Sequence, residues 1–310
     1  MRAINLSTTT LAILGICCCA SAGASDSVDT SKPIKVFVLA GQSNMQGHGR
    51  ISLEKDGDLD YAAKLKQFAY LKKGGEWSQR RDVWYYHKAG RDGVVTKGEL
   101  RIGLGANEKS IGPELVFGHL MGDHFKEQVL LIKCAWGGQP LGGSFRPPSS
   151  GNTGEKYKQV LAEVKDVVAN LEPIFPDYED QGFEMVGFFW HQGWNDGCNR
   201  EFSLEYEENM VNFIKDMRKD LGNEDLPFVI ATSGMGGPNA TGVAGWLSES
   251  VEPAQMAAAA RCERCIAVPT RHYQRHQPGR QKSHWYNSAE SYCLIGDAAA
   301  KAMIKILTED

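Results

Sequence analysis

Short apolar runs alternate along this chain with segments whose apolar residues recur at helical spacing. The run at 34–40 is rich in β-branched residues and stops at Gly41, which is typical of a buried strand that ends in a tight turn. Similar runs predict further strands at 129–134, 185–190, 228–232 and 265–268. Because buried strands that alternate with helices favour a parallel sheet covered on both faces, the pattern indicates an α/β fold.

Helical spacing predicts the elements that cover this sheet. The expected helices lie at 113–126, 156–170, 204–221, 253–261 and 289–307. Pro113 suits the first turn of its helix, and Glu114 suits the positive end of the helix dipole. The predicted fold is therefore a single-domain, three-layer α/β/α sandwich with a central five-stranded parallel sheet, as in flavodoxin-like proteins.

The segment from 49 to 112 breaks the alternation. It is rich in Gly, Lys and Asp, and it holds one aromatic, strand-like piece at 83–86. We interpret it as an insertion after the first strand that lies over the edge of the sheet where reactive residues gather. No internal repeat, low-complexity tract or linker indicates a second domain.

Composition and charge exclude some functions. The 310 residues are 42% hydrophobic and 23% charged, as in globular proteins, and the net charge of -4 offers no basic field for a nucleic-acid backbone. At the N-terminus, Arg2 precedes an apolar stretch at 11–19 and small residues at 20–24. This pattern predicts a secretory signal peptide at 1–24, with no membrane span and a secreted or periplasmic protein. The residues before Cys17, Cys18 and Cys19 fit a lipoprotein signal poorly, so no lipid anchor is expected.

Removal of the signal peptide leaves an odd number of cysteines, and therefore at least one free thiol. Cys262 and Cys265 have the spacing of a metal knuckle or redox pair, but no second pair or nearby histidine pair completes a zinc site. They are either a local disulfide, which export would permit, or two unrelated thiols. No metal is expected.

The loops after the strands carry the reactive residues. The carboxyl ends of parallel strands meet at one edge of a sheet, where chemistry collects. Ser43, just after the first strand, is the candidate nucleophile, and a serine becomes useful only when a base and an oxyanion site converge on it. Gly137 and Gly138 follow the second strand, and hydrogen-bonding side chains at 191–196 follow the third.

These loops resemble a known family. Gly41-Gln42-Ser43-Asn44-Met45, the 137–138 glycine pair and Gly193-Trp194-Asn195-Asp196 are similar to the first three blocks of the SGNH hydrolases, specifically the sialate O-acetylesterase and carbohydrate esterase family six branch. The resemblance covers about 34–302 and implies an SGNH domain at 32–308. It implies a secreted serine esterase that removes acetyl groups from an O-acetylated oligo- or polysaccharide, of acetylxylan or sialate type, without a cofactor.

The family's roles carry over to particular residues. An oxyanion would meet the backbone N–H groups of Ser43 and Gly138 and the side chain of Asn195, with Gln192 as a competing donor, and each such donor is typically worth about 3 kcal/mol. Asn195 could instead be a turn residue. The general base would be His284, in the late loop before the last helix, although the nearby His272 and His276 compete for this role.

The sequence departs from the family in two places. Where many members carry an aspartate three residues before the histidine, Gln281 stands here, and no acid occurs between Glu263 and Glu290. Either Asp196 or Glu290 reaches His284 through space, or the enzyme uses a Ser–His dyad with a backbone carbonyl as orienting group. The second departure is Trp194, where this branch more often has glutamate.

Aromatic residues beside these loops indicate a sugar substrate. Trp136, Trp194 and Trp285, together with Gln42, are the predicted substrate-binding residues, because flat amphipathic rings suit sugar faces. For any single aromatic residue, core packing is the alternative. Two other functions remain open: a carbohydrate-binding homologue that has lost catalysis, which an intact Ser43 argues against, and an SGNH lipase or thioesterase.

Overall fold

The computed structural model describes residues 28–51, 57–89, 93–275 and 281–309. The predicted signal peptide at 1–24, its three cysteines and His276 lie outside these residues. Within them, no helix is both long and apolar enough to span a bilayer.

The centre of the fold is a seven-stranded sheet in the order β11-β10-β9-β1-β8-β5-β6. Neighbouring strands are parallel except for β6, which runs antiparallel to β5. The strands are β1 (Ile34–Gly41), β5 (Arg80–Ala89), β6 (Val94–Leu100), β8 (Val129–Ala135), β9 (Phe183–His191), β10 (Phe228–Ala231) and β11 (Cys265–Val268). All five predicted strands are present, and their mutual pairing is parallel as expected.

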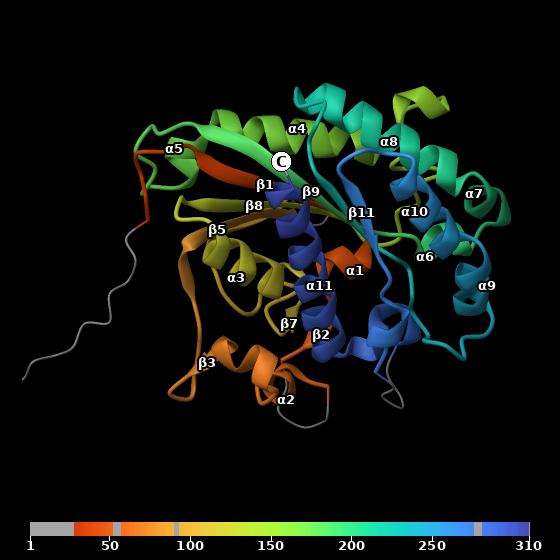
Figure 1. Ribbon diagram of the computed structural model, residues 1–310, viewed down its shortest axis with the longest axis horizontal. Coiled ribbons are helices and arrows are strands. Elements are labelled where there is room, and N and C mark those ends of the chain that lie inside the picture. Colours follow the sequence, from red (N-terminus) through yellow and green to blue (C-terminus); the bar gives the residue numbers. More distant parts are fainter. Residues whose placement is uncertain (1–27, 52–56, 90–92, 276–280, 310) are drawn as a thin grey trace, which may run out of the picture.

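Helices cover both faces of the sheet, which confirms the three-layer α/β/α architecture. Figure 1 shows α4 (Glu155–Ala169) and α8 (Tyr206–Leu221) on one side, and α3 (Glu114–His124) and α11 (Ala289–Thr308) on the other. α10 (Val251–Ala260) packs against α8 and β11. The remaining helices are short: α1 (Ser43–Gln46), α2 (Leu59–Ala62), α5 (Leu171–Ile174), α6 (Trp194–Gly197), α7 (Arg200–Leu204) and α9 (Val243–Glu249).

The inserted segment corrects the predicted strand number. Instead of only lying over the reactive edge, it supplies β5 and β6, which extend the sheet beyond β8 from five strands to seven. It also forms two small antiparallel pairs, β2 (Gly49–Arg50) with β7 (Ser110–Ile111) and β3 (Lys72–Lys73) with β4 (Glu76–Trp77). β6 is largely exposed at the sheet edge, so its sequence lacks the apolar run that marks a buried strand.

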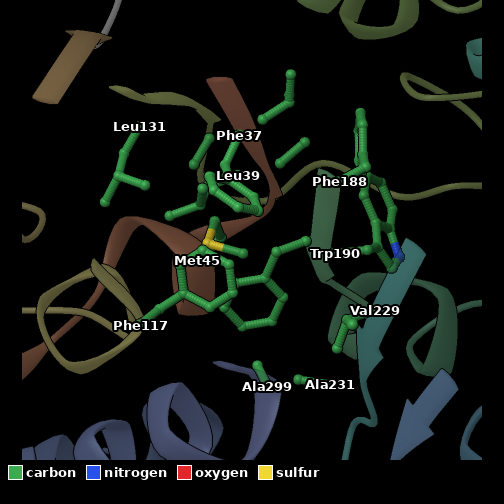
Figure 2. Packing of buried hydrophobic residues seen from close by; sticks show 14 of the residues in the cluster. Phe37, Leu39, Met45, Phe117, Leu131, Phe188, Trp190, Val229, Ala231 and Ala299 are labelled. Carbon is green, nitrogen blue, oxygen red and sulfur yellow. The ribbon is translucent and has the colours of Figure 1, made fainter. Parts of the chain in front are cut away.

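The hydrophobic core holds the reactive loop in place. β1 is buried along nearly its whole length, and Phe37 meets Phe117 of α3 edge to face, with ring centroids 5.4 Å apart. Figure 2 shows Met45 of α1 among the same apolar side chains, near Leu39 and Phe117. Because Met45 is fully buried, the short helix that follows β1 is anchored in the core.

Candidate active site

Ser43 lies at the turn between β1 and α1. Gly41 has φ +154°, and a Cβ there would clash with the backbone carbonyl of His191, so the turn requires glycine. Ser43 is the first residue of α1, and first-turn N–H groups of a helix have no intrahelical partner. The β1 turn therefore presents both a hydroxyl and a free amide donor at the carboxyl edge of the sheet.

The His284 imidazole meets this hydroxyl. His284 Nε2 lies 3.0 Å from Ser43 Oγ. The two loops are joined again by Asn44 Nδ2, which donates to the Ser283 carbonyl at 3.0 Å. Burial lowers the pKa of His284, so its ring is neutral and able to accept a proton at neutral pH.

An unusual backbone turn carries His284. Trp285, Tyr286 and Asn287 all have φ between 52° and 58°, in the left-handed region that non-glycine residues avoid. Such residues cost roughly 1–2 kcal/mol each, so surrounding contacts must hold them. The Trp285 ring is fully buried, and its Nε1 donates to His191 Nε2 at 3.4 Å. The amides of both His284 and Tyr286 donate to the Gln281 carbonyl, which closes the turn.

Gln42 fixes the loop after β9. Its Oε1 accepts from the amides of Gly193 and Asn195 at 3.2 and 3.3 Å, while its Nε2 donates to Asn195 Oδ1 at 2.9 Å. Because Asn195 Oδ1 is engaged in this way, its Nδ2 is left as the donor for a ligand. Gly193 itself has φ +154°, and a Cβ there would overlap the Ser233 hydroxyl.

Asp196 links the loop after β8 to the loop after β9 by hydrogen bonds. Its carboxylate accepts from the amides of Leu141 and Gly142 at 3.0 and 2.8 Å, and from Gln192 Nε2. Burial raises the pKa of Asp196 to about 6, against the opposing pull of these hydrogen bonds. The carboxylate thus fixes the backbone around the site.

A pocket of about 380 Å³ opens beside the Ser43–His284 contact. Gly138 has φ +73°, and nothing lies within 4 Å of the position a Cβ would occupy there. The lining residues come from all four loops: Gln42, Ser43, Gln46, His48, Gly137, Gly138, Trp194, Asn195, Cys198, Gln281, Ser283 and His284. A serine hydroxyl, a neutral imidazole and several amide donors that meet in one pocket suit acyl transfer.

Comparison with known proteins agrees with this geometry. A model of the family described as "Carbohydrate esterase, sialic acid-specific acetylesterase" matches residues 33–305. The chain belongs to this family. It is therefore a carboxylic ester hydrolase of the carbohydrate esterase type, and the resemblance found in its sequence is confirmed. No curated protein sequence matches this esterase.

Solved structures share the fold of this esterase at low sequence identity. A protein from Arabidopsis thaliana is 17% identical, with TM-score 0.58 over 88% of this chain and 98% of that one. NanS is 12% identical, with TM-score 0.53 over 90% of this chain and 99% of that one. A carbohydrate acetylesterase from Xanthomonas citri is 12% identical, with TM-score 0.51 over 86% of this chain and 56% of that one.

Neither predicted orienting acid contacts the His284 ring. Asp196 is engaged by the loop amides described above, and Glu290 Oε1 accepts from Arg275 Nε at 2.8 Å. His284 Nδ1 is buried and has no hydrogen-bond partner among the described residues. Within the described part of the esterase, the arrangement is thus a Ser–His pair without a carboxylate at the second ring nitrogen.

Several predicted ligand-binding residues lie outside the pocket lining. Gln192 is buried, and its Nε2 donates to Gln42, Gln139 and Asp196, so it is not available as an oxyanion donor. Trp136 and Trp285 are buried and do not line the pocket, which leaves Trp194 as the predicted tryptophan that a sugar could contact.

Other histidines and cysteines take different places. His272 is exposed and does not line the pocket, so it does not compete with His284. The five described cysteines are free thiols, and Cys262 and Cys265 form no disulfide. Among the described residues, no group of three or more His, Cys, Asp or Glu side chains could hold a metal ion.

Four further residues line the pocket that were not predicted as site residues: Gln46, His48, Cys198 and Ser283. His48 and Gln46 lie within five residues of Ser43 on the same turn, so their position in the chain was the one signal that could have found them. Cys198 follows α6 and carries no such signal.

Proposed function

We propose that this esterase removes acetyl groups from O-acetylated carbohydrates by an acyl-enzyme mechanism in which Ser43 is the nucleophile and His284 the base. The observation that carries the proposal is the 3.0 Å contact between His284 Nε2 and Ser43 Oγ at the wall of a pocket. A serine needs such a base within hydrogen-bond reach to act as a nucleophile.

The first half of the reaction forms the acyl-enzyme. Ser43 Oγ attacks the acetyl carbonyl carbon as its proton passes to His284 Nε2. The negative charge that develops on the carbonyl oxygen is met by the amides of Ser43 and Gly138 and by Asn195 Nδ2. The tetrahedral intermediate then expels the sugar oxygen, which takes the proton from His284 and leaves as a free hydroxyl.

The second half restores the enzyme. A water molecule attacks the acetyl-serine carbonyl and gives its proton to His284 Nε2. The same donors stabilise the second oxyanion, and the collapse of this intermediate returns the proton to Ser43 Oγ and releases acetate.

The pocket suits a small acyl group attached to a sugar. Trp194 is partly exposed at the wall and offers a flat ring for the apolar face of a pyranose. The open space beside Gly138 accommodates an acetyl carbonyl close to the donors. We further propose that the enzyme acts outside the cytoplasm, on the sole ground of the signal-peptide pattern at 1–24.

The test is acetate release from acetylated xylan and from an O-acetylated sialoside by the mature protein. Ser43→Ala and His284→Ala should each lower kcat by roughly three orders of magnitude or more. His272→Ala is the matched control, since this exposed histidine lies outside the pocket lining.

Three results would contradict the proposal. If His284→Ala keeps its rate, the base is another residue. If the wild type binds acetylated oligosaccharide without release of acetate, the chain is a carbohydrate-binding homologue. If the rate on p-nitrophenyl esters rises as the acyl chain lengthens beyond acetyl, the enzyme is a lipase or thioesterase.

A further inference from the structure

The ring of His48 stacks on the ring of His284. The two ring centroids are 4.0 Å apart and the ring planes differ by 5°. Both side chains line the pocket, and His284 contacts Ser43 through Nε2. His48 therefore covers one face of the proposed base without contact to the hydroxyl that the base activates.

The protein backbone holds this stack in place. His48 lies between Gly47, with φ +91°, and β2, which pairs with β7. Its carbonyl accepts from Asn287 Nδ2 at 3.2 Å. Since Asn287 belongs to the left-handed turn that follows His284, the two stacked residues are fixed to each other through their own segments.

In a serine–histidine pair a carboxylate usually orients the imidazole. When Nε2 accepts the serine proton, Nδ1 carries the hydrogen, and an acid at Nδ1 normally fixes the orientation of the ring. In this chain the Nδ1 of His284 has no partner among the described residues. An imidazole with a hydrogen bond at only one nitrogen can rotate about its Cβ–Cγ bond. The parallel ring of His48 against the face of His284 opposes that rotation.

We propose that His48 is a positioning residue, which holds the plane of the His284 imidazole so that Nε2 stays directed at Ser43. This inference rests on the proposed function. It extends that function by assigning to an aromatic face the orienting task for which a carboxylate was expected.

Burial and, to a lesser extent, the charges around His48 keep its ring neutral. Burial, His284 and Lys133 together lower the pKa of His48 to about 4, in that order of effect. Lys133 projects from β8 and is paired with Glu114 of α3, and on α11 the Tyr292 hydroxyl contacts the His48 backbone. A neutral ring can remain beside His284 when His284 gains the proton of Ser43, whereas a charged ring would be repelled.

The test compares two substitutions of similar size in the full mature protein. His48→Leu fills the space without a flat ring, and His48→Phe restores a flat ring that cannot titrate. The readouts are the rate of Ser43 labelling by a small fluorophosphonate, which needs no natural substrate, and kcat and KM for p-nitrophenyl acetate. His272→Ala is the control for loss of a histidine outside the pocket.

The expected result is a loss carried by kcat. His48→Leu should slow both labelling and kcat by about tenfold to a hundredfold, as misplacement of a reacting group does, with KM changed less than about threefold. His48→Phe should recover most of the loss, and the acid limb of its pH profile should coincide with that of the wild type, since His284 is the group that titrates.

Each other outcome overturns the inference. If His48→Leu reacts as fast as the wild type, the stack has no role in positioning. If His48→Phe is as slow as His48→Leu, or its acid limb moves, the imidazole nitrogens or charge of His48 are what matter. Absence of labelling in the wild type itself would refute the proposed Ser–His chemistry and the inference with it.

Discussion

A buried ion pair supports the helix that carries Ser43. Lys133 of β8 is fully buried, and its Nζ donates to the carbonyls of Gln46 and Leu104 at 2.7 and 3.0 Å and to Glu114 Oε2 at 3.1 Å. The other oxygen of Glu114 accepts from the Gly112 amide at 2.8 Å. Burial lowers the pKa of Lys133 and raises that of Glu114, while their mutual attraction opposes both shifts.

Lys133→Met tests how much this pair stabilises the fold. The substitution keeps the length of the side chain, but it leaves the Glu114 carboxylate buried without its cation and removes one donor from each of two carbonyls. Removal of one partner from a buried pair typically costs about 3–5 kcal/mol. Since the free energy of unfolding of a domain is about 5–15 kcal/mol, the variant should lose roughly a fifth or more of its stability.

A double variant separates the unpaired charge from the lost donors. In Lys133→Met with Glu114→Leu no charge remains buried, so we expect recovery of all but about 1–3 kcal/mol, the cost of leaving the Gln46 carbonyl and the Gly112 amide without these partners. The Leu104 carbonyl still accepts from the Tyr85 hydroxyl at 3.0 Å. The surface control is Lys301→Met, which breaks an exposed pair with Asp297 and should cost less than about 1 kcal/mol.

The assay is urea-induced unfolding followed by tryptophan fluorescence, with the activity of each variant measured alongside. Lys133→Met should also lower kcat, because the Gln46 carbonyl that it releases lies at the end of α1. A loss below about 1 kcal/mol for Lys133→Met, or a double variant as unstable as the single one, would refute the assignment of the cost to an unpaired buried charge.

Three further predictions concern the site. Gly193→Ala should fail to fold, or should lose about 3 kcal/mol or more of unfolding free energy, because its Cβ would overlap the Ser233 hydroxyl. The control Gly222→Ala, at φ +75° with open space around it, should lose about 1 kcal/mol in urea unfolding, and equal losses would contradict this reasoning. The acid limb of the kcat/KM profile should have its midpoint below pH 6.5, because a base with a lowered pKa stays deprotonated at lower pH. A midpoint above pH 6.5 would be inconsistent with the buried His284. Glu290→Gln should keep kcat within about threefold of the wild-type value, because Glu290 pairs with Arg275 and not with His284. A roughly hundredfold loss of kcat would instead show that a carboxylate assists the base.

Much of the fold could be predicted because the buried strands carry continuous apolar runs. β1 and β8 are buried along nearly their whole length, and their sequences show it. β5 was visible only as an aromatic piece at 83–86, and β6 not at all. Whether a half-exposed segment forms an edge strand depends on the strand it pairs with, and the apolar pattern of that segment alone does not show this pairing.

The site was predictable where topology brings loops together. Ser43, Gly138, Asn195 and His284 all line the pocket because they follow strands or precede the last helix at the same edge of the sheet. The orienting acid could not be derived from the sequence, since candidates distant in the chain compete through space. Trp285 shows the same limit: a core tryptophan and a pocket tryptophan look alike until burial is known.

The left-handed turn after His284 has a consequence for engineering. A designer who wished to raise the melting temperature would replace Tyr286 with glycine, which adopts φ 53° without steric strain. The same change would increase the conformational freedom of the backbone next to His284, which the β-carbons of residues 285–287 now restrict. A higher melting temperature would then be accompanied by a less precisely oriented His284 ring. This turn is therefore a poor place to seek a more stable catalyst, although its backbone is strained.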